Sequence, residues 1–227
     1  MKVLSEYEYQ QLLKETKVIE QDKHGEKVLE YPDGRYMKLF RLKRLISSAL
    51  IYPYWRRFVR NAKGLKRLGI PTVAAIESVL KVPHIKKTAV IYQPLLGDTI
   101  IHLYKKDNLS NKLIRQFGEF VADLHYKGVY FSSLHLGNVV LDPENRLGLI
   151  DISDMRIVRF PIPVFTREAN MRYLFHCRQG LNLLSPTGIE HFIEGYLSKT
   201  KPKTKPRMAE FFNQQRKIMT AKANDPK

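Results

Sequence analysis

The segment from Leu124 to Asp154 constrains the fold most. It is expected to hold two short apolar strands on either side of a tight turn at residues 142–145, whose Asp-Pro-Glu-Asn sequence is typical of a turn. Asn138 precedes the first strand and Asp151 follows the second. An oxygen ligand on each of two adjacent strands, pointing the same way, is how a fold holds a divalent cation against phosphates. Mg²⁺ needs few protein oxygens, because nucleotide and water supply the rest.

The first forty residues predict a short helix and then three short antiparallel strands. The strands are expected at Lys17–Glu20, Lys27–Tyr31 and Arg35–Phe40, with Pro-Asp-Gly at 32–34 as the second turn. Lys38 lies in the middle of the third strand, among apolar and aromatic residues. A lysine with buried neighbours is costly unless it pairs with an anion, so Lys38 is a candidate phosphate ligand. The alternative is an edge-strand lysine that discourages aggregation.

A helix is predicted over Tyr52–Leu68, where apolar residues recur at three- and four-residue steps and Gly69 and Pro71 follow the end. Its other face is basic, and no acidic residue occurs between Arg35 and Leu68. The whole chain has 39 Lys and Arg against 22 Asp and Glu, a net charge of +17. This excess indicates an anionic partner, although a charged helix face can simply be solvated.

The remaining regular elements are predicted from periodicity and stop signals. Two strands, three helices and a short amphipathic helix in the basic tail are expected, at Thr72–Leu80, Thr88–Gln93, Ser110–Lys127, Thr166–Arg178, Thr187–Leu197 and Phe211–Lys222. The tail beyond Ser198 has little prospect of folding alone.

Composition excludes several protein classes. Hydrophobic residues make up 44% and charged residues 27%, which excludes wholesale disorder. The single cysteine, Cys177, excludes an intramolecular disulfide and a cysteine-cluster zinc site, and it fits a reducing compartment. Acidic residues in the first fifteen positions argue against a secretory signal, and no apolar run is long enough to span a bilayer.

Four motifs together resemble the protein-kinase-like superfamily. Residues 133–138, Ser-Leu-His-Leu-Gly-Asn, are similar to the D-L-H-x-x-N loop of sugar, choline and aminoglycoside kinases. Residues 149–151 resemble the strand that ends in the metal-binding Asp of D-F-G, and 36–38 occupy the place of the strand-three lysine. Gly-Ile-Pro-Thr at 69–72 follows the helix as in the lipopolysaccharide core (Kdo and heptose) kinases. Within that family the chain most resembles bacterial proteins labelled "toluene tolerance", over about Val18–Leu197.

The resemblance implies a two-lobed α+β fold, with a small antiparallel N-lobe sheet plus one helix and a mainly helical C-lobe. The expected divisions are 1–96 for the N-lobe, 97–198 for the C-lobe and 199–227 for a basic tail. It implies ATP and Mg²⁺ as cofactors. The metal would be held by Asn138 and Asp151, and the residues expected to bind the nucleotide are Lys38, His24 and Gly25 of a reduced glycine-rich loop, and Gln93.

The chain also departs from the family pattern. Ser133 stands where the family has its catalytic Asp, and a serine cannot act as a general base near pH 7. His135 could substitute in part, or it could only brace the loop. The helix supplies no Glu to pair with Lys38. Because a general base contributes typically about 10²–10⁴-fold, a kinase without one can be slow without being inactive.

The resemblance therefore implies a lipopolysaccharide-core sugar kinase, or a catalytically impaired relative, at the cytoplasmic face of the inner membrane. Its acceptor would be an anionic glycolipid or a phosphorylated sugar. One alternative is a pseudokinase that acts as a binding or scaffolding module in envelope biogenesis. A nucleic-acid-binding protein is less favoured, because no RNA-stacking motif is interleaved with the basic residues.

Overall fold

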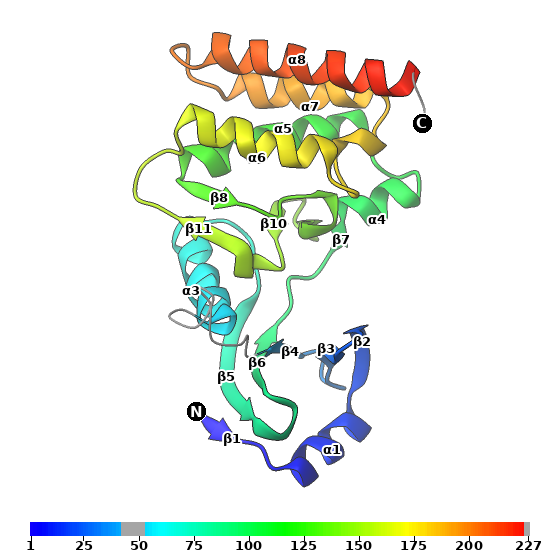
Figure 1. Cartoon of the computed structure of the whole chain (residues 1–227), viewed down its shortest axis with the longest axis vertical. Helices are drawn as coiled ribbons and strands as arrows, with labels where there is room; N and C mark the ends of the chain where they lie inside the picture. The colour runs from blue at the N-terminus through cyan, green and yellow to red at the C-terminus, as the bar shows by residue number, and fades with distance from the viewer. Residues whose placement is uncertain (42–52, 225–227) are drawn as a thin grey trace. The chain divides into compact units, whose positions relative to one another are not determined.

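The computed structural model describes residues 1–41 and 53–224 (Figure 1). The fold is α+β, with a six-stranded mixed sheet and a mainly helical part. The chain divides into two compact units. The first unit contains Met1–Leu96 and Leu149–Asp154, and the second contains Gly97–Gly148 and Met155–Lys227. Residues 199–224, which the sequence analysis set apart as a tail, belong to the second unit.

The sheet of the first unit has the strand order β1-β5-β6-β4-β3-β2. Its strands are β1 (Lys2–Val3), β2 (Lys17–Asp22), β3 (Gly25–Glu30), β4 (Tyr36–Arg41), β5 (Ala74–Val82) and β6 (Lys87–Gln93). The predicted antiparallel run of β2, β3 and β4 is confirmed. The expectation of a purely antiparallel sheet is wrong, because β1 pairs with β5 in parallel. A two-residue edge strand is too short to show the alternation of apolar and polar residues from which a strand is predicted.

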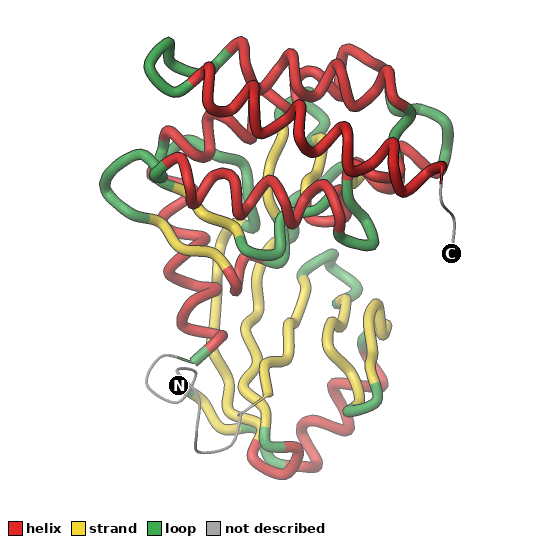
Figure 2. The backbone as a smooth tube through the Cα atoms, turned by 45° about the horizontal axis from the view of Figure 1, so that its top comes forward, coloured by secondary structure: helices red, strands yellow, loops and turns green. Residues whose placement is uncertain are grey.

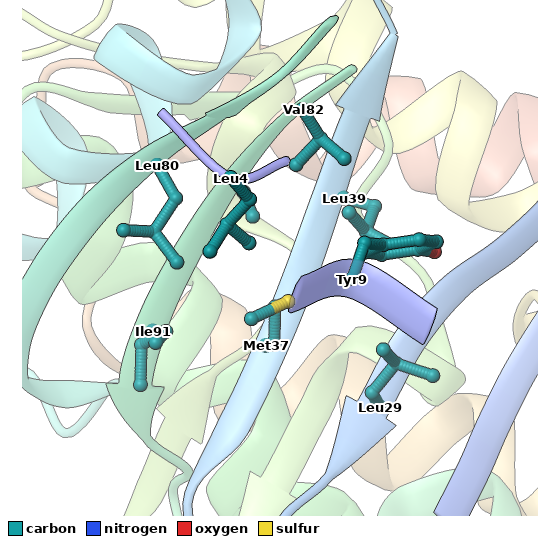
Figure 3. Close-up of a cluster of buried hydrophobic side chains, with 9 residues drawn as sticks. Leu4, Tyr9, Leu29, Met37, Leu39, Leu80, Val82 and Ile91 are labelled. Carbon is teal, nitrogen blue, oxygen red and sulfur yellow. The ribbon is translucent and has the colours of Figure 1, made fainter. Parts of the chain in front are cut away.

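Helix α1 (Glu6–Glu15) follows β1 and covers the sheet from one side. Ser5 caps it, accepting a hydrogen bond from the Glu8 amide while the Glu8 carboxylate accepts from Ser5. Tyr9 of α1 then packs into an apolar cluster formed by the sheet, which Figure 3 shows. The buried members of this cluster are Leu4, Tyr9, Leu29, Met37, Leu39, Leu80, Val82, Ala89 and Ile91.

Helix α3 (Tyr54–Arg67) confirms the predicted helix over 52–68, within the residues described. Phe58, Ala62 and Leu65 are buried, as the periodicity predicted. Trp55 is half-buried. The helix packs on the short 3₁₀ turn η3 (Ile152–Asp154). Its exposed basic residues are Arg56, Arg60, Lys63, Lys66 and Arg67.

The second unit is built mainly from α4 (Ile100–Lys105), α5 (Asn111–Tyr126), α6 (Val164–His176), α7 (Pro186–Ser198) and α8 (Lys205–Asn224). Five short strands accompany them, namely β7 (Asp98–Thr99), β8 (Val129–Phe131), β9 (Val139–Leu141), β10 (Leu147–Leu149) and β11 (Met155–Ile157). The predicted helices near 110–127, 166–178 and 187–197 are confirmed as α5, α6 and α7. Figure 2 shows the helical layers.

Helices α5 and α7 approach each other closely at two glycines. A Cβ on Gly118 would lie 2.1 Å from the Phe192 carbonyl oxygen, and one on Gly195 would lie 2.0 Å from the Arg115 carbonyl oxygen. Neither position can hold a larger residue without moving backbone. The contact of the two helices therefore depends on the absence of side chains at these positions.

Helix α8 is longer than the helix predicted at 211–222. Met208, Phe211 and Phe212 are buried, and α8 packs on α6 and α7 (Figure 1). A segment with low prospects alone is thus stabilised by burying one apolar stripe against its neighbours. Across residues 1–41 and 53–224, no helix is long and apolar enough to cross a membrane.

Candidate functional site

The centre of the candidate site is an ion pair within the first unit. Lys38 Nζ lies 2.6 Å from Asp151 Oδ1, although the two residues are 113 positions apart in the chain. The Lys38 side chain is 13% exposed, whereas that of Asp151 is 55% exposed. The lysine therefore finds the anionic partner that its buried neighbours require, and the carboxylate remains open to solvent.

Asp151 is held in an unusual conformation by hydrogen bonds on both sides. Its φ of +52° lies in the left-handed region, which non-glycine residues rarely adopt. On one side, the Leu149 amide donates to the Pro71 carbonyl at 2.9 Å and the Thr72 hydroxyl donates to the Leu149 carbonyl at 2.7 Å. On the other side, Asn61 Nδ2 donates to the Ile152 carbonyl at 2.7 Å. A strained residue that its surroundings hold in place is a feature of functional sites.

Aromatic rings form the apolar side of this pair. Lys38 Nζ lies 5.9 Å from the Phe58 ring centroid, and the Phe58 and Tyr92 ring centroids are 5.2 Å apart. Burial raises the pKa of the Tyr92 phenol, and the negative charge of Asp151 raises that pKa further. These aromatic residues keep Lys38 out of water, which strengthens its attraction to anionic groups.

A second lysine adds positive charge near Asp151. The hydrogen bond from Lys27 to Glu20 raises the pKa of Lys27, and the charges of Glu20 and Asp151 raise it further. Lys27 lies on β3 and Glu20 on the edge strand β2. Neither Lys27 nor Tyr92 was predicted as a site residue. Strand alternation gives no signal for Lys27, because its neighbour Val28 pairs with Lys38 and alternation assigns Lys27 to the opposite face.

The other nucleotide-site residues predicted in the first unit are placed as follows. His24 is exposed in the turn between β2 and β3, where its amide donates to Asp22 Oδ1 at 2.7 Å. Gly25 begins β3 with a φ of +91°. Gln93 ends β6 and is half-buried. Among the residues described, no hydrogen bond or ion pair given for these three reaches Lys38 or Asp151.

Asn138 in the second unit is oriented by the loop that carries Ser133. Its Nδ2 donates to the Ser133 carbonyl at 3.0 Å, and its own amide donates to the His135 carbonyl at 3.0 Å. Asn138 is 6% exposed. Because the side-chain NH₂ is bound to a carbonyl, the amide oxygen points elsewhere, and oxygen is the atom that Mg²⁺ prefers.

His135 braces this loop. Its Nδ1 accepts a hydrogen bond from the Gly137 amide at 3.0 Å, so the proton of the neutral ring is on Nε2. The Leu136 amide donates to the Gln179 carbonyl at 2.9 Å, which fixes the loop from a second side. In this geometry the Nδ1 lone pair of His135 is used within the loop. Ser133 is half-buried and offers only a hydroxyl at the position of the family's catalytic Asp.

The two candidate metal ligands, Asp151 and Asn138, belong to different units of the chain. No group of three or more His, Cys, Asp or Glu side chains that could hold a metal occurs among the described residues. A zinc-type site needs such a group, whereas Mg²⁺ is commonly bound through one or two protein oxygens plus phosphates and water. Asp151 offers an open carboxylate in the first unit, and Asn138 offers an oriented amide oxygen in the second.

The basic face of α3 contains a shallow hollow of about 270 Å³. It is lined by Trp55, Arg56, Val59, Arg60, Lys63 and Arg67. The Arg56 guanidinium lies 5.2 Å from the Trp55 ring centroid. Four cations around a partly buried indole suit an anionic group attached to an apolar body.

A scan of protein-family models and a search of curated protein sequences found no match to this chain.

Proposed function

We propose that this protein is a kinase-like protein of the lipopolysaccharide-core type, with its two units as the two lobes of a protein-kinase-like fold. The observation that carries the proposal is the 2.6 Å pair between Lys38 Nζ and Asp151 Oδ1. It joins a half-buried strand lysine to a solvent-open, strained carboxylate, the two charges that a magnesium-nucleotide site requires.

In this proposal each charged residue has one role in binding ATP. Lys38 binds phosphate oxygens, and Asp151 together with Asn138 holds Mg²⁺, which when bound neutralises phosphate charge. The sequence order supports the shared role, because Asn138 precedes one strand and Asp151 follows the next. His24 and Gly25 would bind the nucleotide from the turn between β2 and β3, and Gln93 would bind it from the end of β6.

The proposed acceptor is the hydroxyl of an anionic glycolipid or a phosphorylated sugar at the cytoplasmic face of the inner membrane. The acid-free stretch from Arg35 to Leu68 and the basic hollow on α3 support an anionic acceptor. Nucleic acid would meet the same charges, so it remains the competitor in binding tests.

A second candidate, a pseudokinase, is favoured by the catalytic loop. Ser133 replaces the base, and the ring nitrogen of His135 that could act instead is bound to the Gly137 amide. Positioning and charge neutralisation supply most of the rate enhancement in phosphoryl transfer. The remaining residues are therefore compatible with slow turnover, and also with nucleotide binding without measurable turnover.

The test is magnesium-dependent ATP binding by calorimetry and thermal unfolding. A ligand present at 100 times its Kd stabilises the folded state by about 2.7 kcal/mol, which corresponds to several degrees in Tm. Lys38→Met and Asp151→Asn should each remove this shift. Arg35→Met, which removes the exposed Arg35–Asp33 ion pair of the neighbouring turn, should retain it.

No binding by the wild type, or equal binding by all three variants, would refute the nucleotide site. If the wild type binds, a single-turnover assay with radiolabelled ATP separates the two candidates. Release or transfer of the γ-phosphate that Asp151→Asn abolishes supports the kinase, and intact ATP supports the pseudokinase.

A further inference from the structure

One end of the second unit exposes apolar side chains on rigid backbone. Phe160 is 71% exposed, Phe165 is 67% exposed and Val158 is 47% exposed, in the segment from β11 into α6. Their neighbour Ile162 is 4% exposed and so anchors the same segment in the core. Exposed large apolar residues that gather in one short segment indicate an interaction surface.

Hydrogen bonds hold this segment in place. The Val158 amide donates to the Gly128 carbonyl at 2.9 Å, and the Ile162 amide donates to the His125 carbonyl at 2.8 Å. Arg167 Nε donates to the Ile162 carbonyl at 2.7 Å. Pro161 and Pro163 restrict φ between these contacts. These bonds hold the backbone of the segment in place, and on that backbone Val158, Phe160 and Phe165 are exposed.

Basic residues surround the same end. The Arg159 guanidinium lies 5.9 Å from the Phe160 ring centroid. Tyr126 connects the segment to the α7–α8 loop, because Arg167 lies 4.5 Å from its ring centroid and Lys201 Nζ lies 5.5 Å from it. The β11–α6 segment and the α7–α8 loop lie at the same end of the helices of this unit (Figures 1 and 2). The α7–α8 loop and the start of α8 then expose Lys201, Lys203 and Lys205.

One acidic residue at this end, Glu168, is paired. Glu168 on α6 forms an ion pair with Arg207 at 2.6 Å, and its side chain is 17% exposed. We name the exposed residues Val158, Phe160, Phe165, Arg159, Lys203 and Lys205 of this end the Phe160 surface, and it combines three apolar with three basic side chains.

We propose that the Phe160 surface docks this protein onto an anionic lipid bilayer, with the two phenylalanines entering the headgroup region and the cations contacting lipid phosphates. An anionic bilayer has negatively charged headgroups above an apolar interior, and protruding side chains can insert into it without a complementary groove. A peptide partner would need a groove for its own side chains. Single-stranded RNA would stack on the rings, but it offers nothing to Val158. This surface deepens the membrane part of the proposed function, yet it needs neither ATP nor turnover.

The test is co-sedimentation with vesicles of phosphatidylcholine alone and of phosphatidylcholine mixed with phosphatidylglycerol. We expect wild type to bind only the mixed vesicles. Phe160→Ser with Phe165→Ser should weaken binding at least about tenfold, because apolar burial is lost. The matched control is Tyr7→Ser, which removes an aromatic side chain 73% exposed on α1 and should bind as wild type does.

Charge is tested separately from apolar insertion. Arg159→Glu with Lys203→Glu and Lys205→Glu should weaken binding about 100-fold, since each cation near an anionic bilayer adds about 1 kcal/mol, a factor of about five. The control reverses the same number of exposed cations in the first unit, at Lys14, Lys17 and Lys23. Equal loss in both triple variants would mean that net charge, and not this surface, causes binding.

Insertion has a direct optical readout. Phe160→Trp in a Trp55→Phe background places the only indole on the surface, and brominated lipid should quench its fluorescence. Absence of quenching, or release of the protein by single-stranded RNA at equal charge concentration, would overturn the proposal. Lys38→Met should bind vesicles as wild type does, so failure of the nucleotide site and failure of the docking surface are distinguishable.

Discussion

His125 on α5 makes a prediction about acid stability whose size can be worked out. Its side chain is fully buried, with Nδ1 2.8 Å from the Tyr196 hydroxyl and Nε2 3.2 Å from Asn170 Oδ1. Asn170 Nδ2 in turn donates to the Phe131 carbonyl at 2.8 Å. The network joins α5, α6, α7 and β8 through one neutral imidazole.

Burial lowers the pKa of His125 from 6.5 to about 4, against a smaller opposing effect of the Asn170 hydrogen bond. The unfolded chain therefore takes up a proton below pH 6.5, whereas the folded chain does so only near pH 4. The contribution to stability is complete above pH 6.5 and is lost as the pH falls to about 4. At 1.36 kcal/mol for each pH unit between the two values, the loss is about 3 kcal/mol.

The assay is urea unfolding followed by far-UV circular dichroism, at several pH values from 7 to 4. His125→Gln keeps an amide in place of the ring but cannot titrate. Wild type should lose about 3 kcal/mol more than this variant over the range, because carboxylate titrations are common to both proteins. His24→Gln, in an exposed turn, is the matched control and should follow wild type. A constant difference between wild type and His125→Gln at all pH values would refute the reasoning.

Four further substitutions test the site and the contact between α5 and α7. Ser133→Asp restores a carboxylate at the base position and should raise phosphoryl transfer by up to about 10²–10⁴-fold; an assay that shows lower activity than wild type would contradict the proposed role of the loop. Gly118→Ala places a Cβ 2.1 Å from the Phe192 carbonyl oxygen and should cost about 1–3 kcal/mol in urea unfolding, so an unchanged midpoint would contradict the close helix contact. Asp151→Asn leaves the mostly buried Lys38 without its charge partner and should lower the free energy of unfolding by about 1 kcal/mol, whereas Lys38→Met should leave it nearly unchanged. If urea unfolding shows Lys38→Met to be the more destabilised variant, the pair is not held as described.

Local patterns in the sequence determined the elements that carry strong signals. The apolar steps of α3 predicted Phe58, Ala62 and Leu65 as its buried face, because a helix of 3.6 residues per turn places them on one side. The Pro-Asp-Gly turn before β4 followed from the dihedral preferences of those residues. Asn138 and Asp151 were selected because they bracket two short apolar strands. Each of these inferences depends on residues within about one element of each other.

Only the tertiary structure decided which of these residues are in contact, where the His135 proton lies and which side chains are exposed. Lys38 was a candidate either for an anion site or for an edge strand, and only folding brought Asp151 to it across 113 positions. The proton position on His135 follows from the Gly137 amide, and Phe160 is exposed on backbone that bonds to Gly128 and His125 hold in place. Such contacts depend on the path of the whole chain, while sequence periodicity reports only the face on which a residue lies.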